Sequence, residues 1–146
     1  EDSAEVASSE KAESCPIGTE RLLLVDDEKM IARLEEQMFA RLGYHVTTRL
    51  SSVDALEAFR ANPRAYDLVI TDMTMPNMTG EQLAQELIAI RPGLPIIICT
   101  GFSERLSPEK AKAMGIKGFL MKPITILEMS RMVRRVLDAR GPHEEH

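Results

Sequence analysis

Four short segments of this 146-residue chain carry polar side chains that could bind a metal ion or take part in catalysis. Each polar group follows a run of mainly apolar residues: Asp26 and Asp27, Asp72, Thr100, and Lys122. Mg²⁺ prefers carboxylate oxygens and is often completed by a phosphate oxygen. Three close carboxylates would raise one another's pKa values, and a divalent cation and a lysine would relieve that repulsion. The residue types therefore indicate a hard-cation site with room for a phosphate.

Alternating strand and helix patterns explain why these residues would meet. Apolar or alternating runs predict strands at 22–25, 44–48, 66–71, 95–100 and 118–121. Helical patterns and capping signals predict helices at 31–42, 52–61, 79–91, 108–115 and 125–139. Five strictly alternating units predict an α/β fold, a doubly wound parallel sheet with helices on both faces. In such sheets, ligands bind beyond the carboxyl ends of the strands, where the polar groups stand.

The first predicted helix has a regular apolar pattern. Ile31, Leu34, Met38 and Leu42 lie on one face, and Gly43 ends the helix.

Charge is unevenly distributed along the chain. There are 18 Lys and Arg against 23 Asp and Glu, and residues 1–20 hold six of the acids and one of the bases. The rest is neutral, which argues against a nucleic-acid binder. No apolar run is long enough to span a membrane, no secretory signal is visible, and Cys15 and Cys99 have no motif spacing. We expect a cytoplasmic segment that contacts neither nucleic acid nor membrane.

Composition divides the chain into three parts. Residues 1–19 are rich in Ser, Ala and Glu and are predicted to be a disordered linker or tail. Residues 20–140 form one domain with one core. Residues 141–146 are a polar C-terminal tail.

Four motifs together give the sequence a family resemblance. They are Val25-Asp26-Asp27-Glu28, the Asp72–Gly80 segment, Ile98-Cys99-Thr100-Gly101, and Gly118-Phe119-Leu120-Met121-Lys122-Pro123. In this order and spacing, the chain closely resembles the receiver domain of two-component response regulators over about residues 20–140. The resemblance implies a flavodoxin-like (βα)5 fold with strand order 2-1-3-4-5.

The resemblance also implies a phosphoryl acceptor and a metal site. Asp72 would take a phosphoryl group from a phosphohistidine. Asp27 and Asp72 would ligate Mg²⁺, for which Mn²⁺ can substitute. Asp26 would assist through water, and the backbone carbonyl of Thr74 would be a further ligand.

The remaining motif residues have implied roles around the phosphoryl group. Lys122 would pair with Asp72 and then with the phosphoryl oxygens, and Thr100 would hydrogen-bond the phosphoryl group. Phe119 would be an aromatic switch, although a plain core role is equally open for it. The Lys122–Pro123 bond is expected to be cis, as in relatives.

Partners follow from the same resemblance. The donor would be a histidine kinase or a histidine phosphotransfer protein. Phosphorylation would change the surface formed by residues 108–115, 118–121 and 125–139, through which a phosphorylation-dependent dimer could form. As an isolated domain the chain would be an acceptor with slow autodephosphorylation and not an enzyme. The Ser- and Glu-rich N-terminus favours a receiver from a hybrid histidine kinase over a stand-alone regulator.

Three other functions are weighed against this one. A phosphatase of the haloacid-dehalogenase type also uses an aspartyl nucleophile and Mg²⁺, but it needs a second acid where this chain has Thr74. A flavin-binding protein needs a phosphate cradle after the first strand, and Asp26-Asp27-Glu28 would repel a phosphate. A non-phosphorylated interaction module would usually lack one of the key groups, and this chain has them all.

Overall fold

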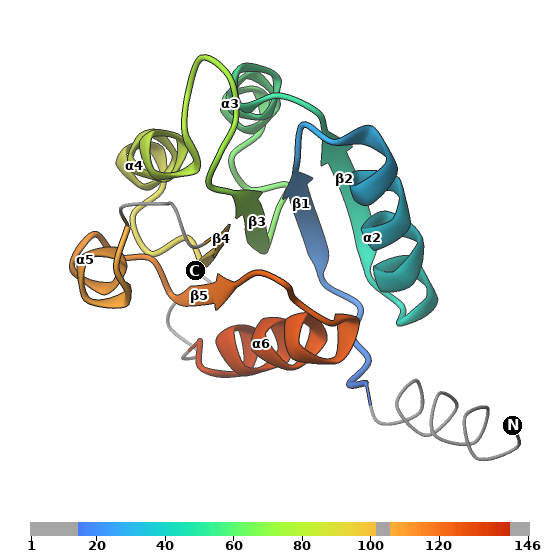
Figure 1. The fold of residues 1–146 in the computed structure, drawn as a ribbon. Helices are drawn as coiled ribbons and strands as arrows, with labels where there is room; N and C mark the ends of the chain where they lie inside the picture. The colour runs from blue at the N-terminus through green and yellow to red at the C-terminus, as the bar shows by residue number, and fades with distance from the viewer. Residues whose placement is uncertain (1–14, 102–105, 141–146) are drawn as a thin grey trace, which may run out of the picture.

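The computed structural model describes residues 15–101 and 106–140, which form a five-stranded parallel sheet. The strands are β1 (Arg21–Val25), β2 (His45–Arg49), β3 (Leu68–Asp72), β4 (Ile96–Thr100) and β5 (Gly118–Met121). Their spatial order is β2-β1-β3-β4-β5, and every neighbouring pair is parallel (Figure 1). The predicted fold class and strand order are confirmed.

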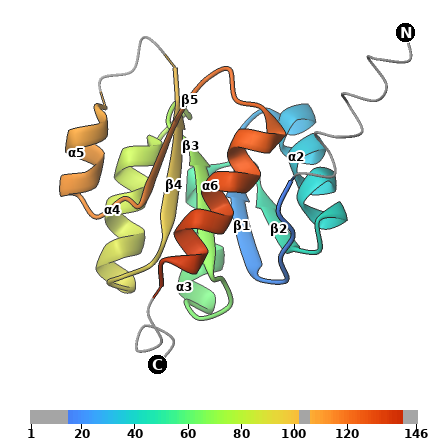
Figure 2. The ribbon, with the colours of Figure 1, turned by 90° about the horizontal axis from the view of Figure 1, so that it is seen from below.

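Five helices cover the two faces of the sheet in the described part of the chain. They are α2 (Lys29–Arg41), α3 (Ser52–Ala61), α4 (Gly80–Ile90), α5 (Pro108–Ala113) and α6 (Ile126–Asp138). Figures 1 and 2 show α2 and α6 on one face and α3, α4 and α5 on the other. Within this part of the chain, the helices are too short or too polar to cross a bilayer.

Each strand contributes to two cores because successive side chains point to opposite faces. In β1, for example, Leu23 packs with α3 and α4, whereas Leu24 packs with α2 and α6. β3 and β4 are buried along their whole length, as expected for strands covered on both sides. The sheet therefore holds the carboxyl ends of β1, β3 and β4 beside one another.

Only part of the apolar face predicted for the first helix packs on the core. Ile31 and Leu34 are 38% and 54% exposed, and the other two predicted residues are only half-buried. The inward stripe consists instead of Ala32 and Phe39, which are buried, with Glu35 between them. Because this stripe contains a small residue and a charged residue, its hydrophobic signal is weak. The periodicity therefore favours the neighbouring stripe that contains Ile31 and Leu34. Glu35 is thereby turned toward the sheet.

The predicted linker differs from the structure at its C-terminal end. Cys15 is buried, and the Gly18 amide donates to the Leu42 carbonyl at 3.0 Å. Gly43 makes this contact sterically feasible: its φ is +105°, and a Cβ atom there would lie 2.3 Å from the Gly18 carbonyl oxygen. Residues 15–19 thus pack on the domain, while residues 1–14 and 141–146 lie outside the described residues.

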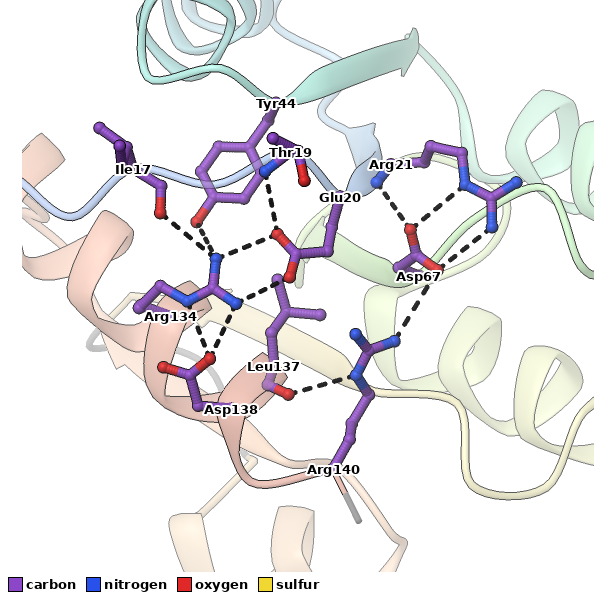
Figure 3. Close-up of polar contacts among 10 residues, drawn as sticks. All are labelled: Ile17, Thr19, Glu20, Arg21, Tyr44, Asp67, Arg134, Leu137, Asp138 and Arg140. Atoms are coloured by element: carbon purple, nitrogen blue, oxygen red, sulfur yellow. Dashed lines mark hydrogen bonds and ion pairs between the residues drawn. The ribbon is translucent and has the colours of Figure 1, made fainter. Parts of the chain in front are cut away.

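Arg134 of α6 ties this N-terminal segment down (Figure 3). Its guanidinium contacts the Glu20 carboxylate at 2.7 Å and the Asp138 carboxylate at 2.8 Å. It also donates to the Tyr44 hydroxyl and to the Ile17 carbonyl. The hydrogen bond from Arg134 lowers the pKa of Glu20 to about 2, so this pair stays charged near neutral pH. Long-range polar contacts of this kind are not visible in local sequence patterns.

Candidate functional site

The carboxyl ends of β1 and β3 bring three aspartates together. Asp72 is the last residue of β3, and Asp26 and Asp27 directly follow β1, its neighbour in the sheet. One carboxylate oxygen from each lies within 4.8 Å of the other two. Asp26 and Asp72 are buried, whereas Asp27 is exposed. A hard cation could therefore reach this cluster from solvent on the side of Asp27 and be bound by the buried Asp26 and Asp72.

Lys122 supplies the counter-charge at this edge. It directly follows β5, and its Nζ lies 2.5 Å from Asp72 Oδ1. The Lys122 amide also donates to the Thr100 carbonyl at 2.7 Å, which fixes the loop to the end of β4. Burial lowers the pKa of Lys122, but the hydrogen bond and negative charge of Asp72 outweigh it and raise the pKa overall. The ammonium group is thus held in its charged form.

The pKa of Asp26 is raised above its ordinary value. Burial is the largest cause that raises the pKa of Asp26, and the charge of Asp72 adds to it. The Glu28 amide opposes this effect by donating to Asp26 Oδ1 at 2.9 Å. Oxygen donors that are close, partly dehydrated and mutually repulsive fit Mg²⁺ or Mn²⁺.

Glu35 is a fourth carboxylate near this edge, and sequence reasoning missed it. Burial raises its pKa to about 7, with further contributions from the charges of Asp26 and Asp72. The signal that could have found it is its position between Ala32 and Phe39, at helical spacing from both.

Thr100 and Phe119 occupy neighbouring strands. Thr100 is the buried last residue of β4, and Phe119 of β5 pairs with Ile98. Because alternate residues of a strand share a face, Thr100 and Phe119 lie on the same side of the sheet, where Phe119 is half-buried. The Lys122–Pro123 peptide bond is cis.

Thr74 lies in the loop between β3 and α4, two residues after Asp72, with its side chain exposed. The loop returns tightly to the site, because the Gly80 amide donates to the Met73 carbonyl at 2.8 Å. The predicted metal and phosphoryl residues are thus gathered at one edge of the sheet, with Phe119 farther along β5.

Gly80 permits this close return of the loop. A Cβ atom on Gly80 would lie 2.3 Å from the Asp72 carbonyl oxygen and 3.0 Å from Met73 Cα, both backbone atoms. We expect Gly80→Ala to lower the free energy of unfolding by about 1–3 kcal/mol, because the backbone beside Asp72 must shift. Urea denaturation measures the loss.

Gly93→Ala is the matched control for this change. Gly93 has a φ of +90° but open space around its Cβ position. We expect a loss of about 1 kcal/mol from backbone strain alone. A Gly80→Ala variant that is as stable as the unaltered chain would show that crowding at Asp72 is unimportant.

Sequence comparisons identify relatives for nearly the whole domain. A family model for the response regulator receiver domain matches residues 22–134. The chain is 34% identical over 131 residues to the two-component response regulator ARR12 of Arabidopsis thaliana, which covers 90% of this chain and 22% of that protein. It is 33% identical over 132 residues to ORR23 of Oryza sativa subsp. indica, with 90% and 19% covered. The chain thus spans about a fifth of these curated relatives.

Solved structures agree with the sequence relatives. A response regulator receiver domain protein from Clostridium thermocellum superposes with a TM-score of 0.78 at 30% identity, covering 82% of this chain and 94% of that one. A CheY-like receiver domain protein from Methanospirillum hungatei gives 0.75 at 26% identity, covering 83% and 95%.

Proposed function

The chain belongs to the response regulator receiver domain family of two-component signalling, and we propose that Asp72 is its phosphoacceptor. The observation that carries this proposal is the position of the Asp72 carboxylate, which lies among two other carboxylates and 2.5 Å from Lys122. An Asp72 oxygen attacks the phosphorus of a phosphohistidine, and the P–N bond breaks. The electron pair leaves with the imidazole, which takes a proton from solvent.

Asp26, Asp27 and Asp72 would hold Mg²⁺, with the Thr74 carbonyl as a further ligand. When bound, the ion neutralises carboxylate repulsion and stabilises charge on the phosphoryl oxygens. Lys122 turns from Asp72 toward the transferred phosphoryl group and stabilises the same charge. Because phosphoryl transfer depends mainly on positioning and electrostatics, this arrangement is sufficient without a further catalytic base.

Phosphorylation would be relayed from Thr100 to Phe119. The acyl phosphate adds about two negative charges. The Thr100 hydroxyl would move toward the phosphoryl group and donate a hydrogen bond to it. Phe119 lies on the same side of the sheet and can fill the space that Thr100 leaves. Movement of both residues would shift the conformation of the surface formed by α5, β5 and α6. This surface would form a dimer or bind a target protein.

The donor would be a histidine kinase or a histidine phosphotransfer protein. We favour a receiver from a hybrid histidine kinase, on the basis of the Ser- and Glu-rich N-terminus and the Cys99-Thr100-Gly101-Phe102-Ser103 sequence. The isolated domain would act as an acceptor that loses its phosphoryl group slowly to water. The relatives reported above carry the names of response regulators, so the hybrid origin rests on sequence features alone.

Acetyl phosphate tests the proposal without a protein donor. We expect the full chain with acetyl phosphate and Mg²⁺ to gain the mass of one phosphoryl group in intact mass spectrometry. Removal of Mg²⁺ with EDTA should abolish the gain, because the carboxylate cluster would then repel the incoming phosphate. A chain that gains no mass with Mg²⁺, or gains it equally with EDTA, would contradict the proposal.

A further inference from the structure

A pocket of about 510 Å³ extends from the acidic site into the space bounded by α2, α6 and the sheet. Its polar wall includes Asp26, Asp72 and Lys122. The rest of its wall is mainly apolar, and the side chains come from three strands, both helices and the loop before α6: Leu24, Ile31, Ile70, Cys99, Ile124 and Met129. Its volume and mainly apolar lining are those of small-molecule sites.

Glu35 is the polar group that distinguishes this pocket from an ordinary packing defect. It lines the pocket from the inward stripe of α2. No hydrogen bond or salt bridge joins Glu35 to another residue in the described part of the chain. Lys122, the cation in the pocket wall, is paired with Asp72. A partly buried carboxylate without a partner is unfavourable, so a cation that entered the pocket would gain a strong charge-assisted contact.

The charge of the wall restricts the class of ligand. The wall holds four acids, Asp26, Glu28, Glu35 and Asp72, and one cation, Lys122, so an anion would be repelled wherever no metal ion neutralises them. A neutral apolar molecule would fill the volume but leave Glu35 desolvated and unpaired. A cation carried on an apolar body satisfies both parts of the pocket.

We propose that this pocket binds a small organic cation, whose apolar body packs against the sheet residues and whose amidinium, guanidinium or ammonium group pairs with Glu35. This inference goes beyond phosphoryl transfer and does not depend on it, since binding is measured without any phosphodonor. A planar amidinium is the best probe because it can donate two parallel hydrogen bonds to a carboxylate.

Benzamidine and benzamide provide a matched pair of probes, because they share shape and differ in charge. We would titrate each into the full chain and follow saturation-transfer NMR of the ligand, at about pH 8 where Glu35 is charged. Saturating Mg²⁺ is present throughout, so that the Asp26, Asp27 and Asp72 carboxylates are occupied. We expect benzamidine to bind at least about tenfold more tightly than benzamide, because one charged hydrogen-bond pair contributes that much.

Two variants locate the binding. Glu35→Gln should lower the affinity for benzamidine by about tenfold and leave the affinity for benzamide unchanged, because the Gln amide keeps the shape of the side chain and loses its charge. Glu57→Gln, an exposed acid on α3, is the control and should change neither affinity. The comparison of the two probes on the unaltered chain needs no variant and so remains decisive if Glu35→Gln fails to fold.

Three outcomes would overturn the proposal: no benzamidine binding in saturating Mg²⁺, equal binding of both probes, or an unchanged affinity in folded Glu35→Gln. Binding that occurs only when Mg²⁺ is left out would place the cation on the aspartate cluster instead. Failure here leaves the acetyl phosphate result untouched, so the two proposals fail separately.

Discussion

Asp72→Asn is expected to abolish the phosphoryl adduct that acetyl phosphate and Mg²⁺ form on this chain. The amide has nearly the same volume as the carboxylate but cannot attack phosphorus and carries no charge for a metal ion. Intact mass spectrometry of the variant measures the result, and the expected loss is complete.

Asp54→Asn is the matched control for this substitution. Asp54 is an exposed acid in the first turn of α3, away from the carboxylate cluster. Its variant should gain one phosphoryl group as the unaltered chain does. An adduct that persists in Asp72→Asn would assign the acceptor role to another residue, with Asp26 and Asp27 as the first candidates.

Glu35→Leu should stabilise the domain at pH 8, and the gain should disappear toward pH 5. The folded-state pKa of Glu35 is raised to about 7 from 4.5, chiefly by burial. An acid whose pKa is raised on folding binds more protons when folded, so stability falls as pH rises from about 4.5 to about 7. Leucine removes this penalty. At a pH above both pKa values, the pKa difference corresponds to a penalty of at most about 3 kcal/mol in the free energy of unfolding. Because solvent reaches the half-buried side chain, we expect a gain of about 1–3 kcal/mol.

Urea denaturation at pH 5 and pH 8 with EDTA present would measure this effect. Glu35→Gln should show the same loss of pH dependence with a smaller stabilisation, because the amide remains polar. Glu57→Leu, on the exposed side of α3, should stay within about 0.5 kcal/mol of the unaltered chain. A Glu35→Leu variant that retains the full pH dependence would show that other groups cause it.

Most of the fold could be predicted because its signals are local. Strand and helix patterns alternate along the chain, and the predicted elements differ from the observed ones by at most two residues at either end. The capping boxes at Thr79 and Thr125 are both formed. The strand-end aspartates could also be found locally, because each follows an apolar run.

The errors arise where several elements decide the environment of one residue. Ile31 and Leu34 form a regular apolar stripe, yet α2 is docked with the neighbouring stripe inward because Phe39 fills the core beside α6. The segment before Glu20 is predicted to be a linker, yet Arg134 holds it through a hydrogen bond to the Ile17 carbonyl, 117 residues away in the chain. No window of local sequence contains such a contact.

The fold class, the order of polar groups at the strand ends and the family of the chain can all be read from short segments of sequence. They depend on hydrophobic periodicity and on residue type, which are local properties. The distances among Asp26, Asp27 and Asp72, the buried face of α2 and the position of Glu35 in a pocket beside the aspartates become visible in the folded structure. These depend on how elements far apart in the chain pack together, which no single segment specifies.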